Sequence, residues 1–125
     1  MPKNPRCVTL RMIAHPADRD GVLTRLHTLC EEQGMVCDVS RDIPYWKIPN
    51  RMETVIEIED CPTWNYGKWS QIYHDLFLQE LTIEWESEGT IRFYTYPPAD
   101  SEDMWIDFRI PSVCFWPKPS KDIRH

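Results

Sequence analysis

Four histidines and five cysteines are the side chains of this 125-residue chain that could ligate a metal or act as nucleophiles. The cysteines form no Cys-x-x-Cys motif and no paired Cys/His spacing of the kind that a zinc site requires. They are Cys7, Cys30, Cys37, Cys61 and Cys114. Free cysteines usually pack as small buried hydrophobes. We therefore expect structural thiols and neither a metal nor another cofactor, although a catalytic cysteine would need only a histidine that the fold brings close.

The histidines form no catalytic pattern either. They are His15, His27, His74 and His125, and no two of them have the four-residue spacing that places two ligands on one helical face. The chain also lacks a P-loop, a G-x-G-x-x-G motif and a G-x-S-x-G motif, and its 4 glycines are too few for a glycine-built phosphate cradle. The sequence thus predicts a protein that is not an enzyme. The alternative is a catalytic site assembled only in three dimensions.

The composition combines an acidic balance with many large aromatic side chains. The chain has 20 acidic against 14 basic residues, a net charge of −6, 6 Trp and 5 Tyr. An acidic surface repels phosphate backbones, so we expect a basic protein as partner and no nucleic acid. No apolar run reaches the ~20 residues of a membrane span, and residues 1–6 have no signal-peptide pattern. We therefore expect a cytoplasmic protein without a membrane partner.

Strand and helix patterns predict one domain over residues 1–116 and a polar tail over 117–125. Alternating apolar residues predict the strands, and apolar residues at helical spacing predict the helices. The expected strands are 7–13, 35–41, 52–59, 81–86, 91–96 and 104–110. The first expected helix starts at Asp18 or Asp20 and ends at Gly34. The second starts at Trp64 and ends at Leu78. The segment 42–50 has two prolines and is expected to protrude as a loop.

The order of these elements is that of a ferredoxin-like βαββαβ fold of the α+β class, with a C-terminal antiparallel strand extension and two helices on one face of the sheet. Right-handed crossovers would put the first strand in the middle, which predicts the strand order 2-3-1-4-5-6. Within the extension, a three-residue loop at 87–89 would set Glu84 opposite Arg92 and Trp85 opposite Ile91.

Side chains on the helix-free side of the sheet are expected to be acidic and aromatic. Carboxylates alone are typical of a solvated face, but rigid aromatic residues rimmed by charge are typical of protein interfaces. Together with the loop, alternation selects Tyr45, Trp46, Glu53, Glu57, Glu59, Glu84, Glu86, Tyr94, Tyr96, Trp105 and Asp107. We expect these residues to bind a partner.

Residues 8–36 resemble the opening strand, turn and helix of an ACT domain. The resemblance lies in the run Asp18 to Leu26, DRDGVLTRL, followed by EQGM at 32–35; the family usually has proline where Asp20 stands. That family is ferredoxin-like, dimerises through its sheets or helices and binds amino acids near the glycine-bearing turn. The resemblance implies an amino-acid-sensing domain with its ligand at Asp18, Asp20, Gly21 and Val22, where helix N–H groups favour an anion. The alternative interpretation is an aspartate cap at the start of a helix.

In size and composition the chain is similar to bacterial immunity proteins, which neutralise cytoplasmic toxins, often basic nucleases, by occluding their active sites. The sequence therefore predicts a binding protein of the immunity or inhibitor kind, a monomer or homodimer, that blocks a basic toxin through the acidic and aromatic face. The amino-acid-sensing domain and an enzyme of unknown type are the alternatives.

Overall fold

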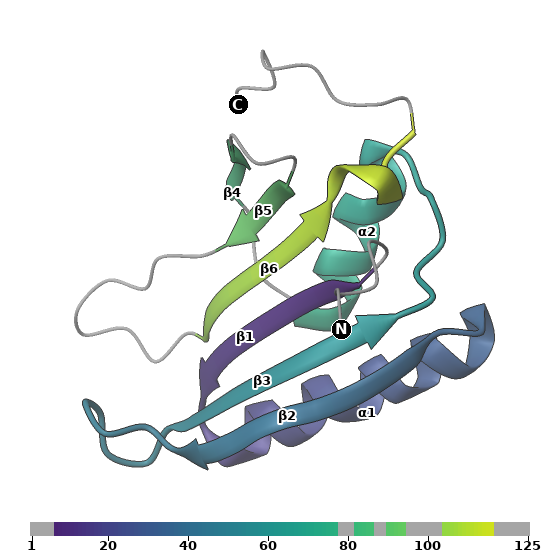
Figure 1. Cartoon of the computed structure of the whole chain (residues 1–125). Helices are drawn as coiled ribbons and strands as arrows, with labels where there is room; N and C mark the ends of the chain where they lie inside the picture. The colour runs from purple at the N-terminus through teal and green to yellow at the C-terminus, as the bar shows by residue number, and fades with distance from the viewer. Residues whose placement is uncertain (1–6, 78–81, 87–89, 95–103, 117–125) are drawn as a thin grey trace.

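The computed structural model describes residues 7–77, 82–86, 90–94 and 104–116. These residues form an α+β fold with two helices and one antiparallel sheet (Figure 1). The elements are β1 Val8–Ala14, α1 Pro16–Gln33, β2 Val36–Pro44, β3 Met52–Glu59, α2 Tyr66–Phe77, β4 Thr82–Glu86, β5 Thr90–Tyr94, β6 Trp105–Pro111 and the short 3-10 helix η1 Ser112–Cys114.

The sheet has the order β2-β3-β1-β6-β5-β4. The neighbours β2, β3 and β1 follow the predicted order, but the other half of the prediction is wrong, because β6 and not β4 pairs with β1. Both strands run antiparallel to β1, so direction alone does not choose between them. β6 carries Ile106, Phe108 and Ile110 on its core side, each at most 1% exposed, and this apolar row takes the central position.

α1 begins earlier than the sequence pattern predicts. Its first residue is Pro16, whose missing N–H is no loss at a helix start, so the predicted start at Asp18 or Asp20 is wrong. The end at Gly34 is as predicted. Gly34 has a φ of 69°, and the next backbone N–H, that of Met35, donates to the carbonyl oxygen of Cys30 at 3.0 Å.

α2 buries the apolar stripe that the sequence predicts. Asn65 caps the helix, because its side-chain oxygen accepts a hydrogen bond from the backbone N–H of Lys68 at 2.8 Å. The buried stripe consists of Trp69, Ile72, Tyr73, Leu76 and Phe77. The ring of Trp69 lies 6.2 Å from that of Phe108 in β6, and its indole N–H donates to the carbonyl of Cys114 at 2.7 Å. These contacts hold α2 against the core side of β6.

One hydrophobic core includes Val22 of α1, Trp69 of α2, and Leu10, Ile56 and Phe108 of the three central strands. Figure 1 shows both helices behind the sheet. We refer to the side of the sheet that points away from this core as the outer face.

The hairpin of β4 and β5 has the predicted register, with Glu84 opposite Arg92 and Trp85 opposite Ile91. Its loop at 87–89 and the predicted tail at 117–125 lie outside the described residues. The loop predicted over 42–50 is shorter than expected, because β2 stays paired with β3 as far as Pro44.

Candidate functional site

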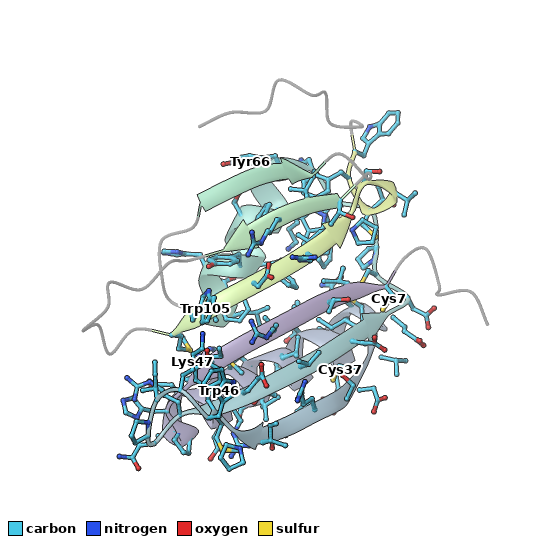
Figure 2. All side chains as sticks on the ribbon, turned by 60° about the vertical axis from the view of Figure 1, so that its left-hand side comes forward. Cys7, Cys37, Trp46, Lys47, Tyr66 and Trp105 are labelled. Carbon is cyan, nitrogen blue, oxygen red and sulfur yellow. The ribbon has the colours of Figure 1, made fainter. Side chains whose placement is uncertain are left out.

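The outer face is assembled from strand positions that the pairing registers bring side by side. Arg11 of β1 lies opposite Asp107 of β6, and Ile13 lies between Glu53 of β3 and Trp105 of β6. Figure 2 shows this face, with Trp105 labelled on β6. Alternation along the strands therefore puts Glu53, Trp105 and Asp107 on the predicted side of the sheet.

Glu53 is buried despite its charge, with only 7% of its surface exposed. The Nε of Arg11 donates to its Oε2 at 3.0 Å, and the Nε of Arg41 lies 3.4 Å from its Oε1. Two guanidinium groups thus neutralise this carboxylate within the chain. Glu53 is therefore paired within the chain, and its contact with a partner stays a prediction.

Asp107 is the centre of a second ion-pair group. The Nε of Arg92 donates to its Oδ1 at 2.6 Å, and the Nε of Arg109 lies 3.3 Å from its Oδ2. Its side chain is only 14% exposed. Asp107, like Glu53, is neutralised by arginines at neighbouring outward positions. The centre of the outer face carries alternating arginines and carboxylates and not the acidic field that the sequence predicts.

Trp105 is half-buried beside Arg11. The guanidinium carbon of Arg11 lies 5.3 Å from the centre of the Trp105 ring, which is a cation–π distance. Among the described residues, its buried indole N–H has no hydrogen-bond acceptor. Trp105 therefore packs against the arginine network, and partner binding by Trp105 stays a prediction.

The two aromatic residues that follow β2 have opposite surroundings. Tyr45 is buried, and its backbone N–H donates to the carbonyl of Arg51 at 2.8 Å, which closes the loop. Tyr45 does not protrude as the sequence led us to expect, because β2 extends to Pro44 and leaves Tyr45 at the base of the loop; partner binding by Tyr45 stays a prediction. Trp46 is 81% exposed, with the Nζ of Lys47 5.0 Å from its ring centre (Figure 2). The loop thus presents one tryptophan to solvent.

Carboxylates remain close together on the outer face where β2 begins. Asp38 of β2 lies directly opposite Glu57 of β3, and Val36 lies opposite Glu59. Like charges in directly opposite positions destabilise a strand pair. Asp38 and Glu59 are exposed, and neither has an ion-pair partner among the described residues. The sequence predicts Glu57 and Glu59 here but misses Asp38, although the alternation in 35–41 already places it on the polar side.

β2 is an edge strand of the sheet, and its apolar side chains reach solvent. Val36 is 54% exposed, Val39 42% and Ile43 40%. An edge strand also presents backbone N–H and C=O groups that no neighbouring strand pairs. The predicted order 2-3-1-4-5-6 already places this strand at the edge, but the alternation in 35–41 puts Val39 among the apolar positions and does not predict its exposure. We refer to one set of residues as the β2 surface: Val36, Asp38, Ile43, Trp46, Glu57 and Glu59.

Three further predicted residues lie on the outer face by register. Glu84 pairs with Arg92, Glu86 with Thr90, and Tyr94 with Asp107. They belong to the opposite half of the sheet from β2. The predicted Tyr96 lies outside the described residues. The structure therefore divides the predicted surface between two regions of the sheet.

The segment predicted to bind an amino acid lies within α1. Since this helix begins at Pro16, the backbone N–H groups of Gly21 and Val22 bond to carbonyls one turn earlier. Val22 is fully buried, and Asp20 forms an ion pair with Arg19 at 3.0 Å. Asp18 is exposed on the first turn. The helix therefore starts before these residues, and amino-acid binding at them stays a prediction.

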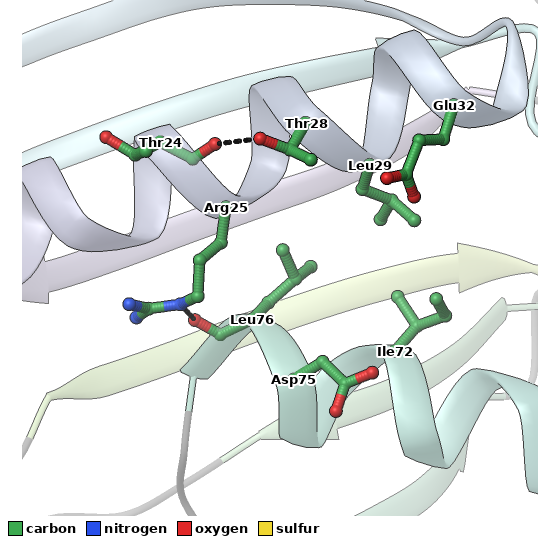
Figure 3. A pocket seen from close by; sticks show the side chains of 8 residues that line it. All are labelled: Thr24, Arg25, Thr28, Leu29, Glu32, Ile72, Asp75 and Leu76. Atoms are coloured by element: carbon green, nitrogen blue, oxygen red, sulfur yellow. Dashed lines mark hydrogen bonds between the residues drawn. The ribbon is translucent and has the colours of Figure 1, made fainter.

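A cleft of about 280 Å³ lies between α1 and α2 (Figure 3). Arg25 reaches across it, since its Nε donates to the carbonyl of Leu76 at 2.9 Å, and the hydroxyl of Thr28 donates to the carbonyl of Thr24 at 3.2 Å. These polar groups are satisfied within the chain, and the volume is below the roughly 300–1,000 Å³ of small-molecule pockets. The cleft is therefore a seam between helices. Its lining residues are Thr24, Arg25, Thr28, Leu29, Glu32, Ile72, Asp75 and Leu76.

No three His, Cys, Asp or Glu side chains of the described residues cluster as metal ligands. None of the described helices is long and apolar enough to cross a membrane. Comparison of the chain with protein-family models, with curated proteins and with solved structures finds no match. The β2 surface is therefore the basis for a functional assignment.

Proposed function

We propose that the chain is a binding protein of the immunity or inhibitor kind, which occludes a basic, nuclease-like toxin in the cytoplasm through the β2 surface. One observation carries this proposal. An exposed edge strand and the loop after it hold apolar side chains in solvent beside Asp38 and Glu59, two exposed carboxylates that have no ion-pair partner among the described residues. Exposed apolar side chains next to carboxylates are the composition expected of an interface that binds a basic protein.

Trp46 is the expected anchor of the complex. Its side chain is 81% exposed and stands on a short loop that is closed at its base by the hydrogen bond between Tyr45 and Arg51. Buried interface tryptophans are typical hot spots, and their truncation commonly costs about 2 kcal/mol or more of binding free energy. A pocket on the partner that covers this ring would supply much of the affinity.

The charge pattern favours a basic partner over an acidic one. Asp38 and Glu59 are exposed near the start of β2, and Glu57 lies directly opposite Asp38. A lysine or arginine of the partner that approaches Asp38 or Glu59 would form charge-assisted hydrogen bonds. Carboxylates presented in this way can take the positions that substrate phosphates occupy in a nuclease. They would also accelerate association in a salt-dependent manner.

The length of the β2 surface suits a protein interface. Seven residue steps separate Val36 from Ile43, which at 3.3 Å per step is about 23 Å of edge strand. The free backbone groups of this edge can also pair with an extended segment of the partner. A strip of this length supports an interface of standard size, about 800 Å² on each side.

The strand order is also compatible with a ferredoxin-like origin of the fold. In this proposal, β6 occupies the position of the fourth strand beside β1, and the β4–β5 hairpin is an addition at the sheet edge. The amino-acid-sensing alternative has less support, because Asp18, Asp20, Gly21 and Val22 lie within α1.

Titration calorimetry with the product of the adjacent reading frame tests the proposal. We expect a stoichiometric complex whose association slows as salt is added, because the carboxylates of the β2 surface steer a basic partner. Absence of heat, together with separate elution of the two proteins in size-exclusion chromatography, would overturn it. A complex whose affinity is indifferent to Asp38→Lys would contradict the assignment of the β2 surface.

A further inference from the structure

The end of α1 and the start of β2 bring three reactive side chains together. The sulfur of Cys37 lies 3.5 Å from the Nδ1 of His27. Cys37 also packs against the hydrophobic core that includes Cys30, and it is close enough to raise the pKa of the Cys30 thiol. His27, Cys37 and Cys30 thus form a chain of one imidazole and two thiols.

The turn at Gly34 is the reason for this arrangement. Gly34 adopts the left-handed conformation, and the N–H of Met35 bonds back to the carbonyl of Cys30, so the chain reverses directly over the last turn of the helix. Alternation in β2 then turns Cys37 toward the core, opposite the buried Ile58. His27 precedes Cys30 by three residues and therefore lies on the same side of the helix.

The two thiols differ in their access to solvent. Cys37 is half-buried, whereas Cys30 is only 4% exposed and belongs to the hydrophobic core. Burial, and then the neighbouring Cys37, raises the pKa of Cys30 to about 12, so Cys30 stays protonated. An oxidant from solvent therefore reaches Cys37 first, and the protonated thiol of Cys30 lies deeper in the core.

We propose that Cys37 and Cys30 are a redox-active thiol pair, in which a hydroperoxide oxidises Cys37 and Cys30 then closes an intramolecular disulfide, with His27 as the proton carrier. The proposal is independent of partner binding, so its test requires no partner.

The first step oxidises Cys37 to a sulfenic acid. His27 accepts the thiol proton, and the thiolate sulfur of Cys37 attacks one oxygen of the hydroperoxide. The O–O bond breaks, and the leaving oxygen takes the proton from His27 to depart as water or an alcohol. The sulfur has given up two electrons, and the peroxide has accepted them.

The second step forms the disulfide. The sulfur of Cys30 attacks the sulfur of Cys37, the S–O bond of the sulfenic acid breaks, and the hydroxide leaves with the proton of Cys30 as water. In total, two thiols lose two hydrogens and one hydroperoxide is reduced. The product joins the last turn of α1 to the first residues of β2 across the Gly34 turn.

Hydrogen peroxide treatment of the full chain, followed by thiol alkylation and non-reducing peptide mass mapping, tests the proposal. We expect a Cys30–Cys37 linked peptide as the main product. Cys7 is the matched control, since it is the other half-buried thiol and its thiol donates to the carbonyl of Val8. Cys7 should remain reduced at the peroxide dose that links the pair.

Variants separate the two steps. Cys30→Ala, or Cys30→Ser if the smaller side chain unfolds the core, should leave Cys37 as a sulfenic acid that dimedone traps. His27→Gln should slow the alkylation of Cys37 at least ~10-fold, because thiolate formation loses its proton acceptor. The proposal is overturned if Cys37 reacts no faster than Cys7, if oxidation links separate chains only, or if His27→Gln leaves the rate unchanged.

Discussion

Glu53 is the residue whose removal tests the ion-pair network of the outer face most sharply. Its side chain is 9% exposed, and its carboxylate lies between Arg11, whose Nε donates to it at 3.0 Å, and Arg41, whose Nε is 3.4 Å away. Glu53→Gln keeps the shape of the side chain and removes its charge. Arg11→Met and Arg41→Met remove one cation each and leave the buried carboxylate in place.

The expected losses of unfolding free energy follow from the burial of the Glu53 side chain. Removing one partner of a buried ion pair costs roughly 3–5 kcal/mol when the remaining charged group is not solvated. Here Arg11 is 39% and Arg41 56% exposed, so both cations regain water when Glu53 is neutralised, and Glu53→Gln should cost about 2 kcal/mol. Arg11→Met leaves the buried carboxylate with its more distant partner and should cost about 3 kcal/mol. Arg41→Met removes an exposed contact and should cost less than about 1 kcal/mol.

Urea unfolding of the three variants measures these differences in the free energy of unfolding. The order of loss should be Arg11→Met, then Glu53→Gln, then Arg41→Met. The reasoning is refuted if Arg41→Met costs as much as Arg11→Met, or if Glu53→Gln is neutral, since either result would mean that the carboxylate is solvated.

Three other predictions concern stability. Tyr45→Ala should cost about 3 kcal/mol because Tyr45 is buried, whereas Trp46→Ala should change the unfolding free energy by less than about 0.5 kcal/mol; equal losses in urea unfolding would contradict this assignment. Gly34→Ala should cost about 1 kcal/mol because of the positive φ, and an unchanged thermal midpoint would argue against the left-handed turn. Burial, and then the neighbouring Cys114, raises the pKa of Cys61 from 9.0 to about 12, so its contribution to stability should be complete below pH 9.0 and decline as the pH rises toward 12. Unfolding free energies measured across this range should therefore fall more steeply in the natural chain than in Cys61→Ala; parallel curves would disprove it.

Local pairing made part of the fold predictable from sequence. Only one register of the β4–β5 hairpin sets Glu84 against Arg92 and Trp85 against Ile91, so charge and apolar patterns agree on it. The buried stripe of α2 follows in the same way from helical spacing. Sheet order is different, because β4 and β6 run in the same direction and either could pair with β1. The choice depends on the packing of Phe108 against Trp69 and Phe77, 6.2 and 5.8 Å away, which no local pattern contains.

The sequence predicted which residues lie on the outer face, but not which of them are buried or paired with other charged groups. Alternation correctly placed Glu53 on the outer face, but its neutralising partner Arg11 lies 42 residues away in the sequence. The role of Tyr45 depended on where β2 ends, and strand ends are the least certain part of a sequence pattern. Cys30 and Cys37 meet because of one left-handed turn between them, and their spacing corresponds to no known ligand motif.

The affinity of Trp46→Ala for the partner, compared with that of Trp116→Ala, tests the central claim most directly. Both tryptophans are exposed, at 81% and 71%, but Trp46 belongs to the β2 surface, whereas Trp116 follows η1 and does not. By calorimetry with the product of the adjacent reading frame, Trp46→Ala should weaken binding about 30-fold, while Trp116→Ala should stay within about 2-fold of the natural chain. Equal affinities for the two variants, or a loss confined to Trp116→Ala, would contradict binding through the β2 surface.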